Sequence, residues 1–460
     1  MTAIITHNFR FSNTNNTFQD YDGSPSDSLY VFIGKSDAWN TTLESIVDGT
    51  PDTPVDGVAE LSRIYQNMIA LKKVNFSDMK RVVPRYDWTT GSTYVAWDDN
   101  DSTMSTKQFY VINSSLKVYK CLKTGSGTSV NEPTHITVEP VEYGDGYIWH
   151  YMFTVSTADA VKFLNPSFIP VETATTAGAE KTYQDSCIST IPKGIWRIVV
   201  TNGGSGYSVA PTVTIEGDGT GATATATVSG GAVTGINISG LLASPRGYGS
   251  GYNYARVVIA APDGSPGTQA TARAVLTPGQ AHGADPEYEL YAHRMEISVD
   301  LEYSDGGGDF IVDNDFRQIG LIKNPINFGS SPEVVSTAET LSALKKLTIS
   351  GISGGSFAED DVIKQTSGTN TSARAYIDAL PTSSPQIIAY HQNEKSGWTS
   401  FEVGETIQNG NGSGAVTATI DSLIDPEFEP FSGTILMVEN RDPINRSTSQ
   451  IEEVRLVIQF

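Results

Sequence analysis

DPEFEPFSGTILMVENRDPINRSTSQIEEVRLVIQF, residues Asp425–Phe460, is the stretch on which our fold assignment rests. Its two apolar runs, Gly433–Val438 and Val454–Phe460, have the composition of short strands. The polar residues Glu439–Pro443 between them predict a bend. A terminal strand stays ordered only when a sheet or a docked surface holds it. We therefore expect this segment to complete a core whose other strands lie far upstream.

The composition is that of a globular, turn-rich β protein. Hydrophobic residues make up 38% of the 460 residues and charged residues 18%, and the 43 glycines accompany frequent Thr, Ser and Val. The formal net charge of -22 argues against nucleic-acid binding, which requires clustered Lys and Arg against the phosphates. The acidity favours repulsion from DNA, attraction to basic partners, or simply a well-solvated surface.

The cysteines and the hydropathy pattern indicate the cellular compartment in which the protein folds. Cys121 and Cys187 are far apart and form no CxxC pair, which disfavours a thiolate metal site and fits a reducing environment. The first residues lack the charged and apolar regions of a signal peptide. No apolar run reaches the roughly 18 residues of a membrane span. We expect a protein made in the cytosol, with no membrane contact.

Periodicity predicts several strands and three helices. The strongest helix signal covers 56–74, where Val58, Leu61 and Tyr65 follow the i, i+3, i+4 spacing of one apolar face. Shorter helices are expected at 158–164 and 337–346. Strands are expected at 3–11, 28–34, 109–113, 116–122, 287–301 and 316–322, and after the Asp-Gly turn of 143–149 as far as Val155.

Two regions rich in small residues contain candidate internal repeats. In 195–277, the sequence Gly-Ser-Gly-Tyr occurs at 204–207 and again at 249–252, a period of about 45 residues. In 347–421, the segment 357–365 aligns with 401–408 at a similar spacing. Each unit alternates small and apolar residues at period two, which predicts short strands joined by glycine turns.

These patterns together predict a mainly β protein with a few helices. We expect a discontinuous β-sandwich core, flanked by helices, made of residues 1–194, 278–346 and 422–460. Two small β modules, 195–277 and 347–421, are expected as insertions into this core. Long insertions are tolerated because the entropy of loop closure rises only slowly with loop length.

The sequence contains no constellation that we assign to catalysis, to a cofactor or to a metal. The six histidines show no HExxH spacing, and the glycine-rich segment 217–221 lacks the Lys-Ser/Thr end of a phosphate-binding loop. The acidic clusters at 98–101 and 305–315 lack EF-hand spacing. A carboxylate pair for sugar hydrolysis stays open, because such pairs come from distant positions in the chain.

Several charged residues lie among aromatic residues. Arg and Trp are favoured anchors of protein interfaces, but the same side chains also lock loops inside a fold. Both roles stay open for these candidate interface or loop-fixing residues: Trp39, Arg85, Asp87, Trp88, Trp149, Arg317, Asn440 and Arg441.

Six short motifs in a fixed order resemble a known family. They are FIGKSDAW at 32–39, VPRYDW at 83–88, VYKCL at 118–122, GDGYIWHYMF at 144–153, FRQI at 316–319 with Asn324-Pro325, and MVENRDPI at 437–444 followed by QIEE at 450–453. Together they resemble the gene product eight family of baseplate wedge subunits from T-even-type contractile-tailed phages. The two repeat modules depart from this pattern.

The resemblance implies a non-enzymatic virion protein with a β-sandwich core flanked by helices. It implies a homodimer within each baseplate wedge, contacts with the other wedge proteins and with tail-fibre attachment components, and assembly in the host cytoplasm. Two alternatives stay open: a glycan-binding or glycan-cleaving tail protein that uses the repeat modules, and a capsid or tail decoration protein. A groove lined by Trp or Tyr rings with paired carboxylates would favour the glycan alternative.

Overall fold

The computed structural model describes residues 4–21, 27–39, 49–188, 193–240, 247–264, 266–302, 309–410, 415–447 and 450–460. The expectation of a mainly β fold with a few helices is confirmed, since these residues form 25 strands and five α-helices. The chain divides into two compact units, each discontinuous in sequence. Unit 1 comprises Met1–Thr14, Lys80–Glu296 and Val457–Phe460, and unit 2 comprises Asn15–Met79 and Ile297–Leu456.

An aromatic-rich sheet forms one part of unit 1. Its strand order is β4-β5-β7-β6, with all pairs antiparallel. Every side chain in the middle of β7 is buried, because the sheet is covered on both faces. The strands of this sheet are β4 (Tyr110–Ile112), β5 (Lys117–Lys123), β6 (Val141–Glu142) and β7 (Ile148–Thr154). The same part of the chain contains η2 (Met104–Thr106), α3 (Thr157–Lys162), α4 (Ala179–Cys187) and α5 (Pro286–Glu289), and β3 (Met79–Pro84) pairs with β8 (Phe168–Val171) in a separate sheet.

Residues 195–277 form a six-stranded antiparallel sheet of unit 1, with the order β12-β11-β10-β13-β14-β9. The strands are β9 (Ile195–Asn202), β10 (Thr212–Gly217), β11 (Ala222–Ser229), β12 (Ala232–Gly240), β13 (Ala255–Ile259) and β14 (Thr271–Leu276). The two Gly-Ser-Gly-Tyr segments make matching bridges, Ser205 with Thr268 and Ser250 with Thr220. The 45-residue repeat and the insertion of this module into a core stay predictions.

Unit 2 contains a five-stranded sheet with the order β17-β2-β1-β16-β24. Its central strand β1 (Leu29–Gly34) is buried along its whole length between β2 (Met68–Lys73) and β16 (Asp315–Lys323). Helix α2 (Val58–Asn67) leads into β2, the short η1 (Phe76–Asp78) follows it, and β17 (Thr340–Ser342) and β24 (Thr434–Asn445) are the outer strands. Apolar side chains of β1, α2 and β16 pack into one core.

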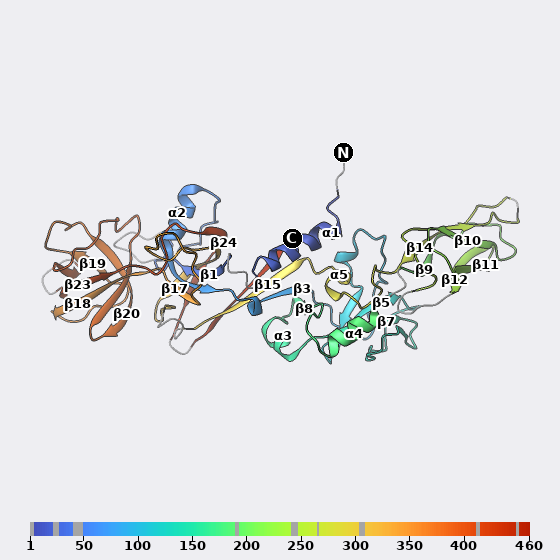
Figure 1. Ribbon diagram of the computed structural model, residues 1–460, viewed down its shortest axis with the longest axis horizontal. Coiled ribbons are helices and arrows are strands. Elements are labelled where there is room, and N and C mark those ends of the chain that lie inside the picture. Colours follow the sequence, from blue (N-terminus) through green and yellow to red (C-terminus); the bar gives the residue numbers. More distant parts are fainter. Residues whose placement is uncertain are drawn as a thin grey trace. The chain divides into compact units, whose positions relative to one another are not determined.

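Residues 345–424 of unit 2 close into a β-barrel with the order β18-β21-β20-β19-β22-β23. Figure 1 shows these strands together in orange. Buried side chains such as Leu347, Ile363 and Ile388 fill the interior, so the barrel has a packed core and no channel. The strands are β18 (Lys345–Ser353), β19 (Val362–Gln365), β20 (Arg374–Ser383), β21 (Gln386–His391), β22 (Thr406–Asn409) and β23 (Thr417–Ile424).

The strand expected at the end of the chain is confirmed. It is β25 (Glu452–Gln459), which neighbours β15 (Arg294–Leu301) in a further sheet. The Ser298 hydroxyl donates a hydrogen bond to the Glu453 carboxylate at 2.7 Å, which ties the two strands together.

Four expectations about local structure are wrong. Residues 3–11 were expected to be a strand, but helix α1 (His7–Gln19) begins there. The helix expected over 56–74 ends at Asn67, because the next six residues pair with β1 as strand β2. The helix expected at 337–346 is replaced by β17 and the start of β18, and the strand expected at 287–301 begins as helix α5. In each case, pairing or packing with distant residues overrides the local pattern.

The helix expected at 158–164 is present with shifted bounds: it is α3 (Thr157–Lys162), and its N-cap is Ser156, whose hydroxyl accepts from the Asp159 N–H. The bend expected at 439–443 is a further correction, because these residues lie inside the 12-residue strand β24. Between the pairs Gln318–Asn440 and Phe316–Ile444, the three residues 441–443 of β24 lie opposite the single residue Arg317 of β16. The polar segment is therefore a β-bulge in a continuous strand.

Candidate functional site

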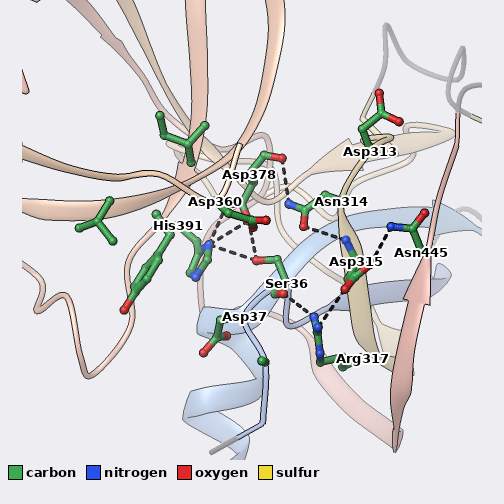
Figure 2. Close-up of a pocket in the computed structure, with 14 residues that line it drawn as sticks. Ser36, Asp37, Asp313, Asn314, Asp315, Arg317, Asp360, Asp378, His391 and Asn445 are labelled. Carbon is green, nitrogen blue, oxygen red and sulfur yellow. Dashed lines mark hydrogen bonds and ion pairs between the residues drawn. The ribbon is translucent and has the colours of Figure 1, made fainter. Parts of the chain in front are cut away.

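A polar cavity of about 190 Å³ lies in unit 2, where the barrel meets the β1-β16-β24 side of the sheet. Its lining comes from six separate segments of the chain, and Figure 2 shows the charged and polar side chains converging. The lining residues are Ser36, Asp37, Ala38, Asp313, Asn314, Asp315, Arg317, Asp360, Val362, Tyr376, Ile377, Asp378, His391 and Asn445.

The segment after β1 enters the cavity through a sharp turn. At Gly34 a side chain would meet the Asn67 carbonyl oxygen at 2.7 Å, so the close approach of the two strands requires glycine. Lys35 then adopts the left-handed conformation, with φ of 59°, and its N–H donates to the same carbonyl. This turn directs Ser36 away from the sheet and toward the barrel.

Asp378 is the centre of a buried hydrogen-bond network. Its carboxylate is 1% exposed and accepts hydrogen bonds from the Ser36 hydroxyl and from His391 Nδ1, the latter at 2.8 Å. The amide of Asn314 donates to the Asp378 carbonyl oxygen at 2.8 Å. The ring of Tyr376 stacks on His391 with a centroid distance of 5.2 Å. The network joins β20 and β21 of the barrel to the β1 turn (Figure 2).

Arg317 forms the second half of the network. Its guanidinium, 3% exposed as a residue, donates to the Ser36 carbonyl oxygen and to the Asp315 carboxylate, the latter at 2.9 Å. The other Asp315 oxygen accepts from the Asn445 amide at 2.9 Å. One buried cation therefore holds the turn after β1 against β16, and Asp315 links β16 to the end of β24.

The excess of carboxylates around the cavity shifts several pKa values. Burial alone would lower the pKa of His391, but the charge of Asp378 and its hydrogen bond outweigh burial and raise it. Burial, followed by the charges of Asp378 and Asp315, raises the pKa of Asp360. Burial and the charges of Asp313, Asp360 and Asp378 raise the pKa of Glu359 to about 7. Protonation of these groups therefore stabilises the junction.

The geometry does not match a nucleophilic triad. In such a triad, one ring nitrogen of the histidine accepts a hydrogen bond from the nucleophile, and the other donates a hydrogen bond to the orienting carboxylate. Here the Ser36 hydroxyl and the Asp378 carboxylate both meet Nδ1 of His391, at 3.2 and 2.8 Å. Within the described residues, no group of three or more His, Cys, Asp or Glu side chains is placed to hold a metal ion. The arrangement can fix the barrel on the sheet.

The two acidic clusters noted in the sequence have separate positions. Asp98 forms ion pairs with Arg197, at 3.3 Å, and with Arg273. Asp305 lies outside the described residues, and Asp309 accepts from the Thr340 hydroxyl at 2.7 Å. Asp313 and Asp315 line the cavity.

Four of the predicted residues meet around the bulge of β24. The bulged residues 441–443 lie opposite Arg317 of β16. The indole N–H of Trp39 donates to the Arg441 carbonyl oxygen at 2.8 Å. The Asn440 side chain accepts from Gln318 at 2.9 Å and donates to the Asp52 carbonyl oxygen at 2.7 Å.

These contacts are internal to unit 2 and agree with a loop-fixing role for Trp39, Arg317 and Asn440. Only the Arg441 side chain is substantially exposed, at 45%, where it pairs with Glu439 at 3.1 Å. Among the described strands, β24 is at the edge of its sheet, and a bulge, a proline and charges are features that prevent edge strands from pairing with other chains. The segment that the sequence marked as a bend therefore protects a sheet edge.

The other four predicted residues lie in unit 1. Arg85 donates to both oxygens of the Asp87 carboxylate, the shortest contact being 2.9 Å, and to the Asn165 carbonyl oxygen at 3.1 Å. The indole N–H of Trp88 donates to the Ser129 hydroxyl at 3.2 Å. Trp149 is fully buried beside Tyr147 and Tyr94, which form an aromatic cluster with it.

Few features of the sequence indicate the cavity. Ser36, Asp37 and Arg317 lie inside two of the motifs that carry the family resemblance, and Arg317 is among the candidate residues. Asp378 and His391 lie in the module 347–421, for which the sequence predicts only short strands, and 12 residues separate them. The pairing of β20 with β21 brings these two side chains together, and no periodic pattern in the sequence marks that pairing.

Comparison with known proteins supports the resemblance in sequence. Residues 3–130 match the family of Gp8 from bacteriophage T4. The chain is also 25% identical over 189 residues to the baseplate wedge protein gp8 of Enterobacteria phage T4. That match covers 33% of this chain, and the chain spans about half, 55%, of the relative's length. The expected resemblance is thereby confirmed: residues 3–130 of this chain are similar to the Gp8 family of bacteriophage T4.

Proposed function

We propose that this chain is a structural component of the baseplate of a contractile phage tail. The observation that carries the proposal is the match of residues 3–130 to the Gp8 family, together with the 25% identity to a baseplate wedge protein. The cavity in unit 2 agrees with a scaffold role, because its polar groups hydrogen-bond one another and join separate elements. In the described part of the chain, no helix is both long and apolar enough to cross a membrane.

The finer assignment extends this proposal to assembly. The chain holds neighbouring wedge subunits together through protein–protein contacts, forms a homodimer within each wedge and contacts tail-fibre attachment components. It is assembled in the host cytoplasm and carried in the virion. Exposed apolar side chains in both units, such as Val161, Ile136 and Phe431, supply surface for such contacts.

A phage with a stop codon early in this gene tests the structural role. We expect infected cells to accumulate filled heads without complete contractile tails, and a plasmid copy of the gene to restore infectious particles. Electron microscopy of the lysates reads out the result. Complete baseplates on particles that lack this chain would contradict the proposal.

Sedimentation of the purified chain tests the homodimer. The expected species has twice the 49.4 kDa mass of the chain. Removal of about 195–277 is expected to leave the dimer intact, because we place the assembly contacts outside that module. A monomer at micromolar concentration would contradict the dimer, and loss of the dimer on deletion would contradict the placement of its contacts.

The glycan alternative receives no support from the positions of the module aromatics. Tyr207 and Tyr252 are each 3% exposed and pack inside the six-stranded sheet module, so their rings are not available for stacking on a sugar. Tyr254 of unit 1 and Trp398 of unit 2 are exposed. Trp398 lines a cavity of unit 2 with Tyr65 and Tyr390, but none of the residues that line it is Asp or Glu, so the paired carboxylates that glycan cleavage requires do not line this cavity. We therefore do not adopt the glycan-cleaving alternative.

A further inference from the structure

Unit 2 contains a second cavity, of about 310 Å³, with walls of a different chemistry. Aromatic rings and prolines dominate its lining, which draws on α2, the end of β21, the loop after it and the segment between β23 and β24. The principal lining residues are Tyr65, Tyr390, Trp398, Pro426, Pro430 and Phe431.

Two of these rings are exposed to solvent, which is energetically unfavourable. Trp398 is 48% exposed and Phe431 is 54% exposed, although both are among the most hydrophobic side chains. Phe431 also has φ of 68°, a left-handed conformation that is unusual for a bulky residue. Backbone strain of this kind persists where the surrounding structure enforces it, and it is concentrated at functional sites.

The contacts around Phe431 show how its conformation is enforced. The Ser432 N–H donates to the Glu429 carbonyl oxygen, and the Ser432 hydroxyl accepts from the Ile326 N–H at 3.0 Å. The Tyr65 hydroxyl donates to the Gly433 carbonyl oxygen at 2.9 Å, and its ring lies 5.7 Å from that of Phe431. The turn is fixed on both sides, so the exposed ring is part of a preformed surface.

The chain segment that borders this cavity is acidic. The segment DPEFEPF at 425–431 contributes Pro426, Pro430 and Phe431 to the lining, carries three carboxylates and no basic residue, and its Asp425 is exposed. Burial, and then the charge of Asp425, raise the pKa of the Tyr390 phenol that lines the cavity. The basic residues among those lining the cavity are Lys345 and His391, and His391 forms an ion pair with Asp378 at 2.8 Å. An acidic rim around an apolar pocket is complementary to an apolar group with a basic neighbour.

We propose that this cavity is a docking site for another protein of the tail, which inserts a large apolar side chain flanked by Lys or Arg. The inference rests on the proposed function and names the surface and the partner chemistry that it requires. The exposed rings supply the apolar anchor site at the centre, and the carboxylates at the rim select the charge of the partner segment.

Complementation of phage that lack this gene tests the docking site. Plasmids supply the wild-type chain or the variants Phe431→Ala, Trp398→Ala and Val403→Ala, and the amount of chain in purified tails is measured by quantitative mass spectrometry. Val403 is the matched control, because it is an exposed apolar residue, 56% exposed, on the barrel surface and does not line the cavity. We expect at least a tenfold loss of incorporation for each ring variant and no change for Val403→Ala.

The possible outcomes separate this inference from the proposed function. Equal incorporation of all the variants would overturn the docking site and leave the structural role standing. Failure of the wild-type chain to enter tails would overturn both. Thermal unfolding of each purified variant shows whether it is folded. If the Phe431→Ala protein is not folded, the incorporation of Trp398→Ala alone tests the docking site. Conversion of a dimer to a monomer by either ring variant would assign the cavity to a second copy of this chain and overturn the proposal.

A charge reversal tests the stated chemistry of the partner. Asp425→Lys places a cation on the rim, and we expect it to reduce incorporation at least fivefold. Asp425→Asn serves as its matched control, with a smaller loss expected. Normal incorporation of Asp425→Lys would overturn the requirement for a basic partner segment.

Discussion

Replacement of Arg317 by Gln removes a buried charge that links the β1 turn to β16. In the folded protein the guanidinium is almost fully buried and donates to both the Ser36 carbonyl oxygen and the Asp315 carboxylate. Gln is shorter and neutral, so it leaves Asp315 unpaired within a cluster of carboxylates. The variant therefore tests whether this arginine fixes the fold or binds a partner.

The magnitude follows from the burial of the two partners. Loss of one partner from a buried ion pair costs about 3 to 5 kcal/mol. The Asp315 side chain is 29% exposed, which places Arg317→Gln at the lower end, about 3 kcal/mol. Unit 2 spans roughly 225 residues, for which each kcal/mol lowers the midpoint temperature by about 2 to 4 °C. We expect the transition of unit 2 to fall by about 6 to 12 °C.

Arg441→Gln is the matched control, since Arg441 lies in the bulge opposite Arg317. Its ion pair with Glu439 is about half exposed on both sides, and such pairs contribute about 0 to 1 kcal/mol. Differential scanning calorimetry of the two purified variants measures both effects and reports whether the transition of unit 1 is unchanged. An Arg317→Gln protein as stable as the wild type, or a pair of variants with equal losses, would refute the argument.

Three further predictions concern buried or titrating groups. Glu359→Gln should stabilise the protein at pH 8 by about 1 to 2 kcal/mol, because ionisation of Glu359 destabilises the wild type as pH rises from about 4.5 to about 7. In urea titrations, the difference in unfolding free energy between variant and wild type should vanish below pH 4.5. A difference that does not depend on pH would contradict the raised pKa of Glu359. Trp149→Ala should cost about 3 to 5 kcal/mol in the transition of unit 1; a loss below 1 kcal/mol would show that the ring does not support the core. Lys120→Met should cost about 3 to 5 kcal/mol by leaving Glu289 unpaired, and Lys120→Met with Glu289→Met should recover part of it; a double variant less stable than the single one would refute this cause.

The strands that the sequence predicted correctly are those buried by their own composition. β1, β5, β7 and β16 consist of apolar and aromatic residues, and any sheet that includes them buries them on both faces. The wrong predictions concern residues whose secondary structure is set by pairing with a strand that is distant in sequence. Residues 68–73 continue a helical pattern but pair with β1, and residues 340–342 pair with β2. Helical periodicity alone could not reveal either pairing.

The candidate site was predictable only in part. Arg317 and Trp39 were named from their aromatic surroundings, and the contacts of both are internal. Asp378 and His391 follow no sequence motif that indicates a site, and they meet only because β20 pairs with β21 in the barrel. The bulge at 441–443 was noted as a polar break but assigned as a bend, because a proline next to charged residues ends many strands. Here these residues belong to an edge strand that tolerates them.

A map of the intact phage particle by electron cryomicroscopy tests the central claim most directly. The account predicts density for both units of this chain in the tail baseplate, with side chains of neighbouring tail proteins against its surface. Density for the chain on the capsid, or particles with complete baseplates that contain no copy of it, would contradict the account.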